Sequence, residues 1–179
     1  PSVSAKLIAG HQDWVQSVAF APDGTWFASA GLDKTIRLWV TAAGTPLGTL
    51  RQSYAVNAIA ISSTGKWLAS AGDDGTVRLW EAKSGTPLGA FSGPGYAVYA
   101  VAFSPDGKLL AAAGKDRLVF VWDVNDGRRV QTLEGHTGDI YSLAFSPDGK
   151  SLAAAGADKT ILVWNVTQGL ESMRMSGHK

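Results

Sequence analysis

The sequence predicts an all-β fold of four-stranded antiparallel sheets, four per chain, arranged as the blades of a β-propeller. The first observation behind this prediction is a repeat, because Trp39, Trp80, Trp122 and Trp164 follow one another at intervals of 41, 42 and 42 residues. The second is that each copy contains short hydrophobic runs joined by turn residues such as Pro22-Asp23-Gly24. The third is that no connection has room for a helix of about ten residues, which excludes parallel sheets built from βα units.

The first copy shows how the strands are expected to follow one another. Residues 15–20 form the predicted first strand and residues 26–30 the second, with turn residues between them. After a tight turn at Asp33-Lys34, residues 35–39 form the third strand, and residues 45–50 form a weaker fourth strand. This last run contains a proline, which an outer edge strand tolerates because it has no partner on one side.

Small residues fill the predicted second strand of every copy. Such strands let neighbouring sheets approach closely, as the blades of a propeller must. The four runs are Ala28-Ser29-Ala30, Ala69-Ser70-Ala71, Ala111-Ala112-Ala113 and Ala153-Ala154-Ala155.

The whole chain, residues 1–179, is expected to form a single propeller unit. The predicted blades span approximately residues 10–50, 51–91, 93–133 and 135–175. A further outer strand is expected at residues 4–9, ahead of the first blade. The four sets of inner strands are thus accompanied by five candidate outer strands, at residues 4–9, 45–50, 86–91, 128–133 and 170–175.

Composition excludes several classes of partner. The formal net charge is +1 and no run of Lys or Arg exceeds two residues, so we expect no nucleic-acid partner. No apolar run reaches about 18 residues, so we expect no membrane partner. The sequence has no cysteine, which removes disulfides and thiolate metal sites and fits a reducing compartment. The expected location is the cytoplasm.

Several short motifs resemble those of the WD-repeat β-propeller family. Gly10-His11 opens the first copy and "LDKTIRLW" closes it, while Gly135-His136 and "ADKTILVW" repeat the pattern. The pair Trp122-Asp123 matches the family's Trp-Asp signature. The likeness covers essentially all 179 residues, although Trp39, Trp80 and Trp164 are followed by other residues than Asp.

The resemblance implies a structural hydrogen-bond network in each blade, made of a His, a Ser or Thr, an Asp and the Trp. The matching residues are His11, Ser29, Asp33 and Trp39 in the first copy, Ser70, Asp74 and Trp80 in the second, Asp116 and Trp122 in the third, and His136, Asp158 and Trp164 in the fourth. The remaining positions have diverged. Gln52 and Pro94 stand at the histidine position, and Ala112 and Ala154 stand at the hydroxyl position.

No catalytic, metal or cofactor site is expected. His11, Ser29 and Asp33 have the residue types of a catalytic triad, but the blade network explains them fully and no "GxSxG" elbow accompanies them. The three histidines, His11, His136 and His178, occupy the same repeat position in different copies. They should therefore not converge on one metal ion.

Candidate partner-binding residues follow from the resemblance, which implies that proteins or peptides bind the face formed by loops leading into the first strands. The candidates are Trp14, Gln16, Tyr54, Asn57, Tyr96, Tyr99, Lys115, Asp139 and Tyr141. They combine aromatic and polar groups, as binding hot spots do. The alternative is that these side chains fill space between blades or loops. Trp26 and Trp67 begin equivalent second strands, and the sequence leaves open whether they are exposed or buried between blades.

The number of copies raises the question of how the ring closes, because the resemblance implies seven or eight blades. Three arrangements remain open: a cyclic dimer with eight blades, a half-propeller that is open or completed by another chain, and a self-closed ring of four blades. An exposed blade edge favours self-association.

The expected function is a non-catalytic scaffold for protein–protein interactions. One alternative is a fragment of a larger regulatory protein without independent function, which the start at Pro1 and the unfinished copy at Gly177-His178 favour. Another is an enzyme or ligand-binding propeller with its site in the channel.

Overall fold

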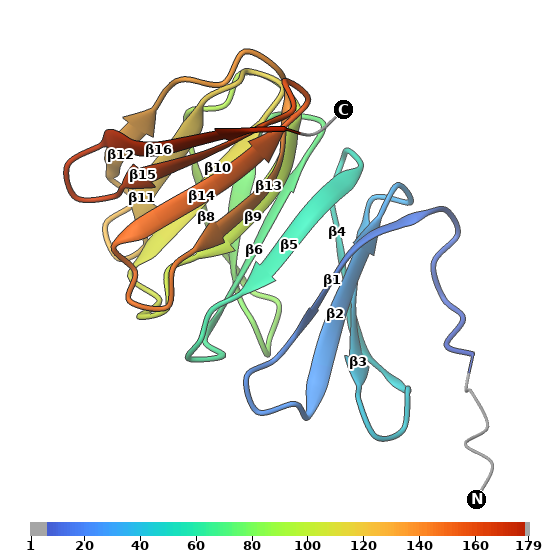
Figure 1. The fold of residues 1–179 in the computed structure, drawn as a ribbon. Helices are drawn as coiled ribbons and strands as arrows, with labels where there is room; N and C mark the ends of the chain where they lie inside the picture. Colours follow the sequence, from blue (N-terminus) through green and yellow to red (C-terminus); the bar gives the residue numbers. More distant parts are fainter. Residues whose placement is uncertain (1–6, 178–179) are drawn as a thin grey trace, which may run out of the picture.

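The computed structural model describes residues 7–177, and within this range it contains sixteen β-strands and no helix. The strands form four separate sheets of four strands each, which follow one another along the chain as blades 1 to 4 (Figure 1). No described segment forms a helix long and apolar enough to cross a membrane.

Each blade contains four consecutive strands that pair in sequence order. Blade 1 contains β1 (Val15–Phe20), β2 (Trp26–Gly31), β3 (Thr35–Val40) and β4 (Pro46–Arg51). Blade 2 contains β5 (Val56–Ile61), β6 (Trp67–Gly72), β7 (Val77–Glu81) and β8 (Pro87–Phe91). Blade 3 contains β9 (Val98–Phe103), β10 (Leu109–Gly114), β11 (Val119–Asp123) and β12 (Arg129–Leu133). Blade 4 contains β13 (Ile140–Phe145), β14 (Ser151–Gly156), β15 (Thr160–Asn165) and β16 (Leu170–Ser176).

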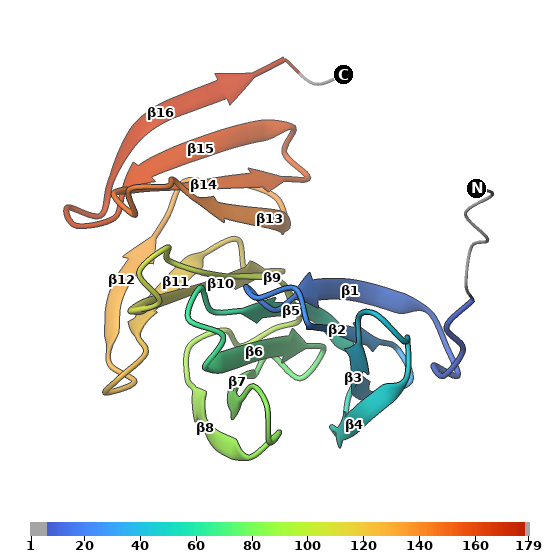
Figure 2. The same cartoon turned by 90° about the horizontal axis from the view of Figure 1, so that it is seen from below.

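The blades stand around a common centre. All pairing within them is antiparallel, and the first strands β1, β5, β9 and β13 contact one another in that order. Figure 2 shows these four strands at the inside of an arc, with β4, β8, β12 and β16 at its outside. The arrangement is a propeller with part of the ring open.

Three hydrophobic clusters hold the arc together, one between each pair of neighbouring blades. Every blade has two faces of different composition. Its forward face carries residues such as Ile36 and Leu38 of blade 1, which pack on the next blade. Its rear face carries the tryptophan and its neighbours, such as Trp80 and Leu68 of blade 2, which pack on the preceding blade. The alanines of the second strands belong to these clusters and are buried in blades 1 to 3, as is the central alanine of the blade 4 run.

The two ends of the arc each leave one face uncovered. The three clusters of described residues join blade 1 to 2, 2 to 3 and 3 to 4, and none joins blade 4 to blade 1. On the rear face of blade 1, Val18 and Phe20 are 64% and 62% exposed. Figure 2 shows the opening between β13–β16 and β1–β4. The self-closed four-bladed ring, one of the three expected arrangements, is therefore not the arrangement in this structure.

The outer strands number four among the described residues, not five. Of the leading strand expected at residues 4–9, residues 4–6 lie outside the described range, and residues 7–9 are not in a strand. Each outer strand seen in the structure, β4, β8, β12 or β16, pairs with the third strand of its own blade. β16 is exposed along its whole length.

Candidate protein-binding site

Four β-bulges define one end of the central channel. In each blade the pairing of the first and second strands skips one residue near the start of the first strand, and these skipped residues are Gln16, Asn57, Tyr99 and Tyr141. A bulge inserts one unpaired residue and redirects its side chain. The same irregularity therefore presents four side chains at equivalent places in four blades.

A glycine makes each of the first three bulges possible. Gly31, Gly72 and Gly114 end the second strands opposite the bulges, and a Cβ atom at any of them would collide with a backbone carbonyl oxygen at the start of the first strand. The missing side chain lets the two strands approach at this point. The glycine after each small-residue run thus positions the bulge residue in the neighbouring strand.

The four bulge residues line one shared cavity of about 360 Å³, which we call the channel mouth. The rings of Tyr99 and Tyr141 stack with centroids 5.5 Å apart and an interplanar angle of 28°. The side-chain amide of Asn57 donates to Asp73 Oδ1 over 2.8 Å and to the Val98 carbonyl oxygen over 3.2 Å. The mouth is thus aromatic on one side and carries fixed polar groups on the other.

Two carboxylates act on Tyr99, one member of the stacked tyrosine pair. Burial raises the pKa of Tyr99, and the charges of Asp139, Tyr141 and Asp73 raise it further. Negative groups raise the pKa of a phenol because they disfavour a second negative charge nearby. The channel mouth therefore combines an aromatic surface with acidic groups.

The structure brings together only part of the candidate set. Gln16, Asn57, Tyr99 and Tyr141 line the cavity, and Asp139 acts on it electrostatically. The remaining candidates do not line it: Trp14, Tyr54, Tyr96 and Lys115 are exposed in the loops around this end of the strands.

Asp73 belongs to the site, although nothing in the sequence distinguishes it from its equivalents in the other repeats. It occupies the same position before the turn as Leu32, Lys115 and Ala157, and Lys115 was the one expected to bind a partner. The hydrogen bond from Asn57 distinguishes Asp73 from the other three. That bond depends on the contact between β5 and the turn after β6, so repeat position alone does not reveal it.

The complete structural network forms in blade 1. The imidazole of His11 contacts Asp33 Oδ2 through Nδ1 at 2.9 Å and Ser29 Oγ through Nε2 at 2.7 Å. A carboxylate only accepts, so Nδ1 carries the proton and Ser29 donates to Nε2. The indole N–H of Trp39 donates to Ser29 Oγ over 2.8 Å. Ser29 is buried and fully engaged, which removes it as an accessible nucleophile.

Blade 2 rebuilds the network without a histidine. The amide of Gln52 donates to Ser70 Oγ over 2.7 Å, and Trp80 donates to the same oxygen over 2.9 Å. Arg78 then bridges the gap, donating to Gln52 Oε1 over 3.0 Å and to Asp74 Oδ2 over 2.6 Å. The sequence interpretation missed Arg78, although an arginine three residues after the turn in "DGTVRLW" was a usable signal.

Blades 3 and 4 keep fragments of the network. In blade 4, His136 Nδ1 donates to Asp158 over 2.9 Å, but its Nε2 is buried without a partner among the described residues because Ala154 replaces the serine. Trp164 donates instead to the Glu134 carbonyl oxygen over 3.1 Å. In blade 3, with Pro94 at the histidine position, Trp122 donates to the Ser92 carbonyl oxygen over 3.1 Å.

The network carboxylates differ in pKa according to how many donors they have. Burial raises the pKa of Asp33, but hydrogen bonds from Gln12, Thr35 and His11 outweigh it and lower the pKa to about 2. The pKa of Asp158 is lowered even further for the same reason, because Thr137, Thr160 and His136 donate hydrogen bonds to its carboxylate. For Asp116 burial is the largest influence, and the weak hydrogen bond from the Leu118 N–H and the residue's own N–H do not offset it, so the pKa of Asp116 is raised.

The described residues contain no cluster of three or more His, Asp or Glu side chains placed to hold a metal ion. His11 and His136 each bind the aspartate of their own blade. His178, the third histidine, lies outside the described residues. The arrangement at the channel mouth is suited to noncovalent recognition, because its four lining side chains are two amides and two phenols.

The chain resembles known proteins both as single repeats and as a whole arc. The family described as "WD domain, G-beta repeat" matches residues 3–40, 44–81, 85–123 and 127–165. The pre-mRNA-splicing factor PRP46 of Yarrowia lipolytica is 49% identical over 39 residues, which are 22% of this chain and 9% of that protein. The Notchless protein homolog of Arabidopsis thaliana is 55% identical over 42 residues, again 22% of this chain and 9% of that protein.

Solved structures match over nearly the full chain. The structure of U3-55K superposes with a TM-score of 0.91 at 30% identity, covering 97% of this chain and 55% of that one. The WD40 repeats of RRP9 give a TM-score of 0.90 at 30% identity, covering 96% and 54%. The chain thus spans about half the length of these solved chains and about a tenth of the curated relatives. Four matched repeats that together cover most of the sequence establish that the chain belongs to the WD40 repeat family.

Proposed function

We propose that this protein is a non-catalytic scaffold that binds protein segments at its channel mouth. The observation that carries the proposal is the convergence of four bulge residues from four blades on one cavity with stacked tyrosines. Proteins of this family are generally non-enzymatic scaffolds. Aromatic side chains that a partner can bury, together with a few fixed polar groups, are typical of protein-binding hot spots.

The charges at the mouth indicate the kind of segment that binds. The charges of Asp73 and Asp139 act on Tyr99, and an ammonium or guanidinium group is attracted both by carboxylates and by the faces of aromatic rings. The proposed partner segment therefore carries a lysine or an arginine that enters the mouth.

A titration of the tyrosine ring signals tests this proposal. Protein labelled at its four tyrosines is titrated with random-sequence peptide pools that share a central Arg, a central Lys or a central Glu. We expect the Arg and Lys pools to shift the Tyr99 and Tyr141 signals in a saturable way, and Tyr141→Ala to weaken binding at least tenfold.

Tyr54→Ala serves as the control, because Tyr54 is a similarly exposed tyrosine outside the cavity. It should leave affinity within a factor of two. An equal response to the Glu pool, or wild-type affinity in Tyr141→Ala, contradicts the proposal.

We also propose that the chain associates with itself through its two open faces. The positions of Ile36 and Leu38, which cover blade 2, are occupied in blade 4 by Ile161 and Val163 on its uncovered forward face. The positions that receive them in blade 2, Ile59 and Leu68, correspond to Val18 and Phe27 on the uncovered rear face of blade 1. Two copies placed head to tail would repeat an interface that the chain already forms three times.

The cytoplasm is the proposed location, because a cysteine-free protein held together by interblade packing needs no oxidising compartment. The curated relatives include a pre-mRNA-splicing factor and a ribosome biogenesis protein. Imaging of the tagged protein tests this: a signal confined to the nucleus contradicts the proposed location and leaves the binding proposal standing.

A further inference from the structure

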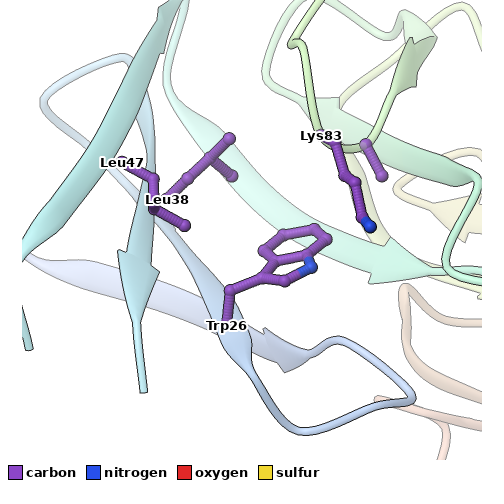
Figure 3. Close-up of a pocket in the computed structure, with 5 residues that line it drawn as sticks. Trp26, Leu38, Leu47 and Lys83 are labelled. Carbon is purple, nitrogen blue, oxygen red and sulfur yellow. The ribbon is translucent and has the colours of Figure 1, made fainter. Parts of the chain in front are cut away.

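A cavity of about 250 Å³ lies between blades 1 and 2, at the opposite end of the strands from the channel mouth. Blade 1 contributes Trp26 at the start of β2, Leu38 of β3 and Leu47 of β4. Blade 2 contributes Ala82 and Lys83 from the turn between β7 and β8. Figure 3 shows the Trp26 indole between the two leucines and Lys83. The walls are therefore mainly apolar, with one cation at the edge.

The cavity exists because blade 2 has a small residue where the other interfaces have a larger one. The backbone N–H groups of Ala82, Val124 and Val166 make the same hydrogen bond, to the carbonyls of Lys66, Lys108 and Lys150. These three residues are thus structurally equivalent. Val124 packs into the interface of blades 2 and 3, and Val166 into that of blades 3 and 4. Ala82 fills less space and leaves the indole of Trp26 facing a void.

Two polar donors at this cavity lack a strong acceptor within the described residues. The indole N–H of Trp26 has no hydrogen-bond partner there, and Lys83 forms no ion pair. In Figure 3 the indole nitrogen is on the edge turned toward Lys83. Asp23 is a carboxylate that interacts electrostatically with Lys83, and it already accepts hydrogen bonds from the N–H and the hydroxyl of Thr25. An indole N–H and an ammonium group both donate, so a ligand oxygen with negative charge satisfies both.

The geometry points to a second binding site here, which accepts the leucine side chain of a peptide whose neighbouring group is a carboxylate. The volume is below the range of about 300–1,000 Å³ that drug-sized ligands occupy, so it fits one side chain rather than a whole ligand. The carboxylate is the side chain of an adjacent Glu or Asp, or the carboxyl terminus of the peptide. The site is independent of the channel mouth, because the two share no residue.

The test follows the indole N–H signals of the seven tryptophans in protein labelled with ¹⁵N-tryptophan. The probe is the acetylated, amidated peptide Gly-Leu-Glu-Gly. We expect it to shift the Trp26 signal in a saturable way, and we expect Gly-Ala-Glu-Gly and Gly-Leu-Gln-Gly to bind at least fivefold more weakly. Acetyl-Gly-Gly-Leu with a free carboxyl end distinguishes the two sources: tighter binding of this peptide identifies a chain terminus as the ligand.

Two variants decide whether the cavity is the site. Ala82→Val introduces the residue that the other two interfaces already contain, so it should fold normally, retain the other six indole signals and lose at least tenfold in affinity. Lys83→Gln should lower the affinity for the peptide about fivefold and remove the dependence of this affinity on salt. Lys150→Gln, an exposed lysine of blade 4, is the control and should change nothing. A shift of Trp26 that does not saturate, or wild-type affinity in Ala82→Val, overturns the inference.

Discussion

A single imidazole nitrogen shows how the divergence of the repeats affects stability at the residue scale. His136 Nε2 is buried without a donor among the described residues, whereas the equivalent atom of His11 accepts a hydrogen bond from the hydroxyl of Ser29. A buried polar atom without a hydrogen-bond partner lowers the stability of the fold, and a group that supplies this hydrogen bond restores the lost stability. The substitution Ala154→Ser places a hydroxyl at the position equivalent to Ser29. We expect it to raise the free energy of unfolding by about 1 kcal/mol, measured by urea denaturation.

Blade 3 provides the matched control. Ala112→Ser adds the same hydroxyl at the equivalent position, where Pro94 replaces the histidine and Trp122 already donates to the Ser92 carbonyl oxygen. Without an imidazole to receive it, this hydroxyl should bring no stabilisation. Equal effects of Ala154→Ser and Ala112→Ser on the free energy of unfolding would show that the unpartnered His136 Nε2 does not explain the stabilisation.

Two equivalent aspartates should respond to pH with opposite sign. The pKa of Asp33 falls from an ordinary value of 3.8 to about 2 in the folded protein, so its carboxylate stabilises the fold above about pH 4 and this contribution is lost as the pH falls towards about 2. Burial raises the pKa of Asp116. The charged form of Asp116 therefore costs stability at neutral pH, and the cost disappears at pH values below 3.8.

Urea denaturation of two variants between pH 7 and pH 3 measures this difference. Asp33→Asn should lower the free energy of unfolding at pH 7 by about 2 kcal/mol, and the difference from wild type should shrink below about pH 4. Asp116→Asn should raise the free energy of unfolding at pH 7 and converge with wild type in acid. If both variants changed the free energy of unfolding at pH 7 in the same direction, the opposite pKa shifts of Asp33 and Asp116 would be contradicted.

At the scale of the element, most strands were predictable because each combines a β-rich run with turn residues at its ends. The run at 26–30, for example, becomes β2 (Trp26–Gly31) and the run at 35–39 becomes β3 (Thr35–Val40). Two adjacent turns on the chain suffice to define such a strand.

Features that depend on two elements meeting were not predictable from the repeat alone. The bulges at Asn57 and its equivalents require a glycine in the paired strand to lie against a carbonyl oxygen. The replacement of an imidazole by Gln52 and Arg78 depends on side chains 26 residues apart. The cavity beside Trp26 depends on the size of Ala82 in the next blade. Each of these is a property of a contact between segments, which sequence periodicity does not describe.

At the scale of the whole molecule, the head-to-tail proposal predicts the mass in solution. Light scattering after size exclusion should give twice the chain mass of 18.7 kDa, because two arcs then close as one ring. Val18→Glu on the rear face of blade 1 and Met175→Glu on the forward face of blade 4 should each reduce association. Both side chains are substantially exposed in the single chain, so neither change should unfold it.

Mixing the two variants identifies the geometry. In a head-to-tail contact each variant keeps one intact face, so the mixture should form heterodimers that neither variant forms alone. In a symmetric contact only one of the two substitutions matters and mixing restores nothing. Tyr54→Glu, which changes neither face, is the control. A strict monomer at every concentration, or a dimer insensitive to both substitutions, would overturn the proposal.

The two-faced blade also has an evolutionary consequence. Because the first three blades each pack their forward face on the rear face of the next blade in the same way, an additional period of about 42 residues can be inserted between two blades without redesigning either neighbour. Gene duplication can therefore lengthen or shorten such an arc by whole blades while each interface stays intact. The networks that have diverged in blades 2, 3 and 4 record the independent substitutions that this modular growth permits.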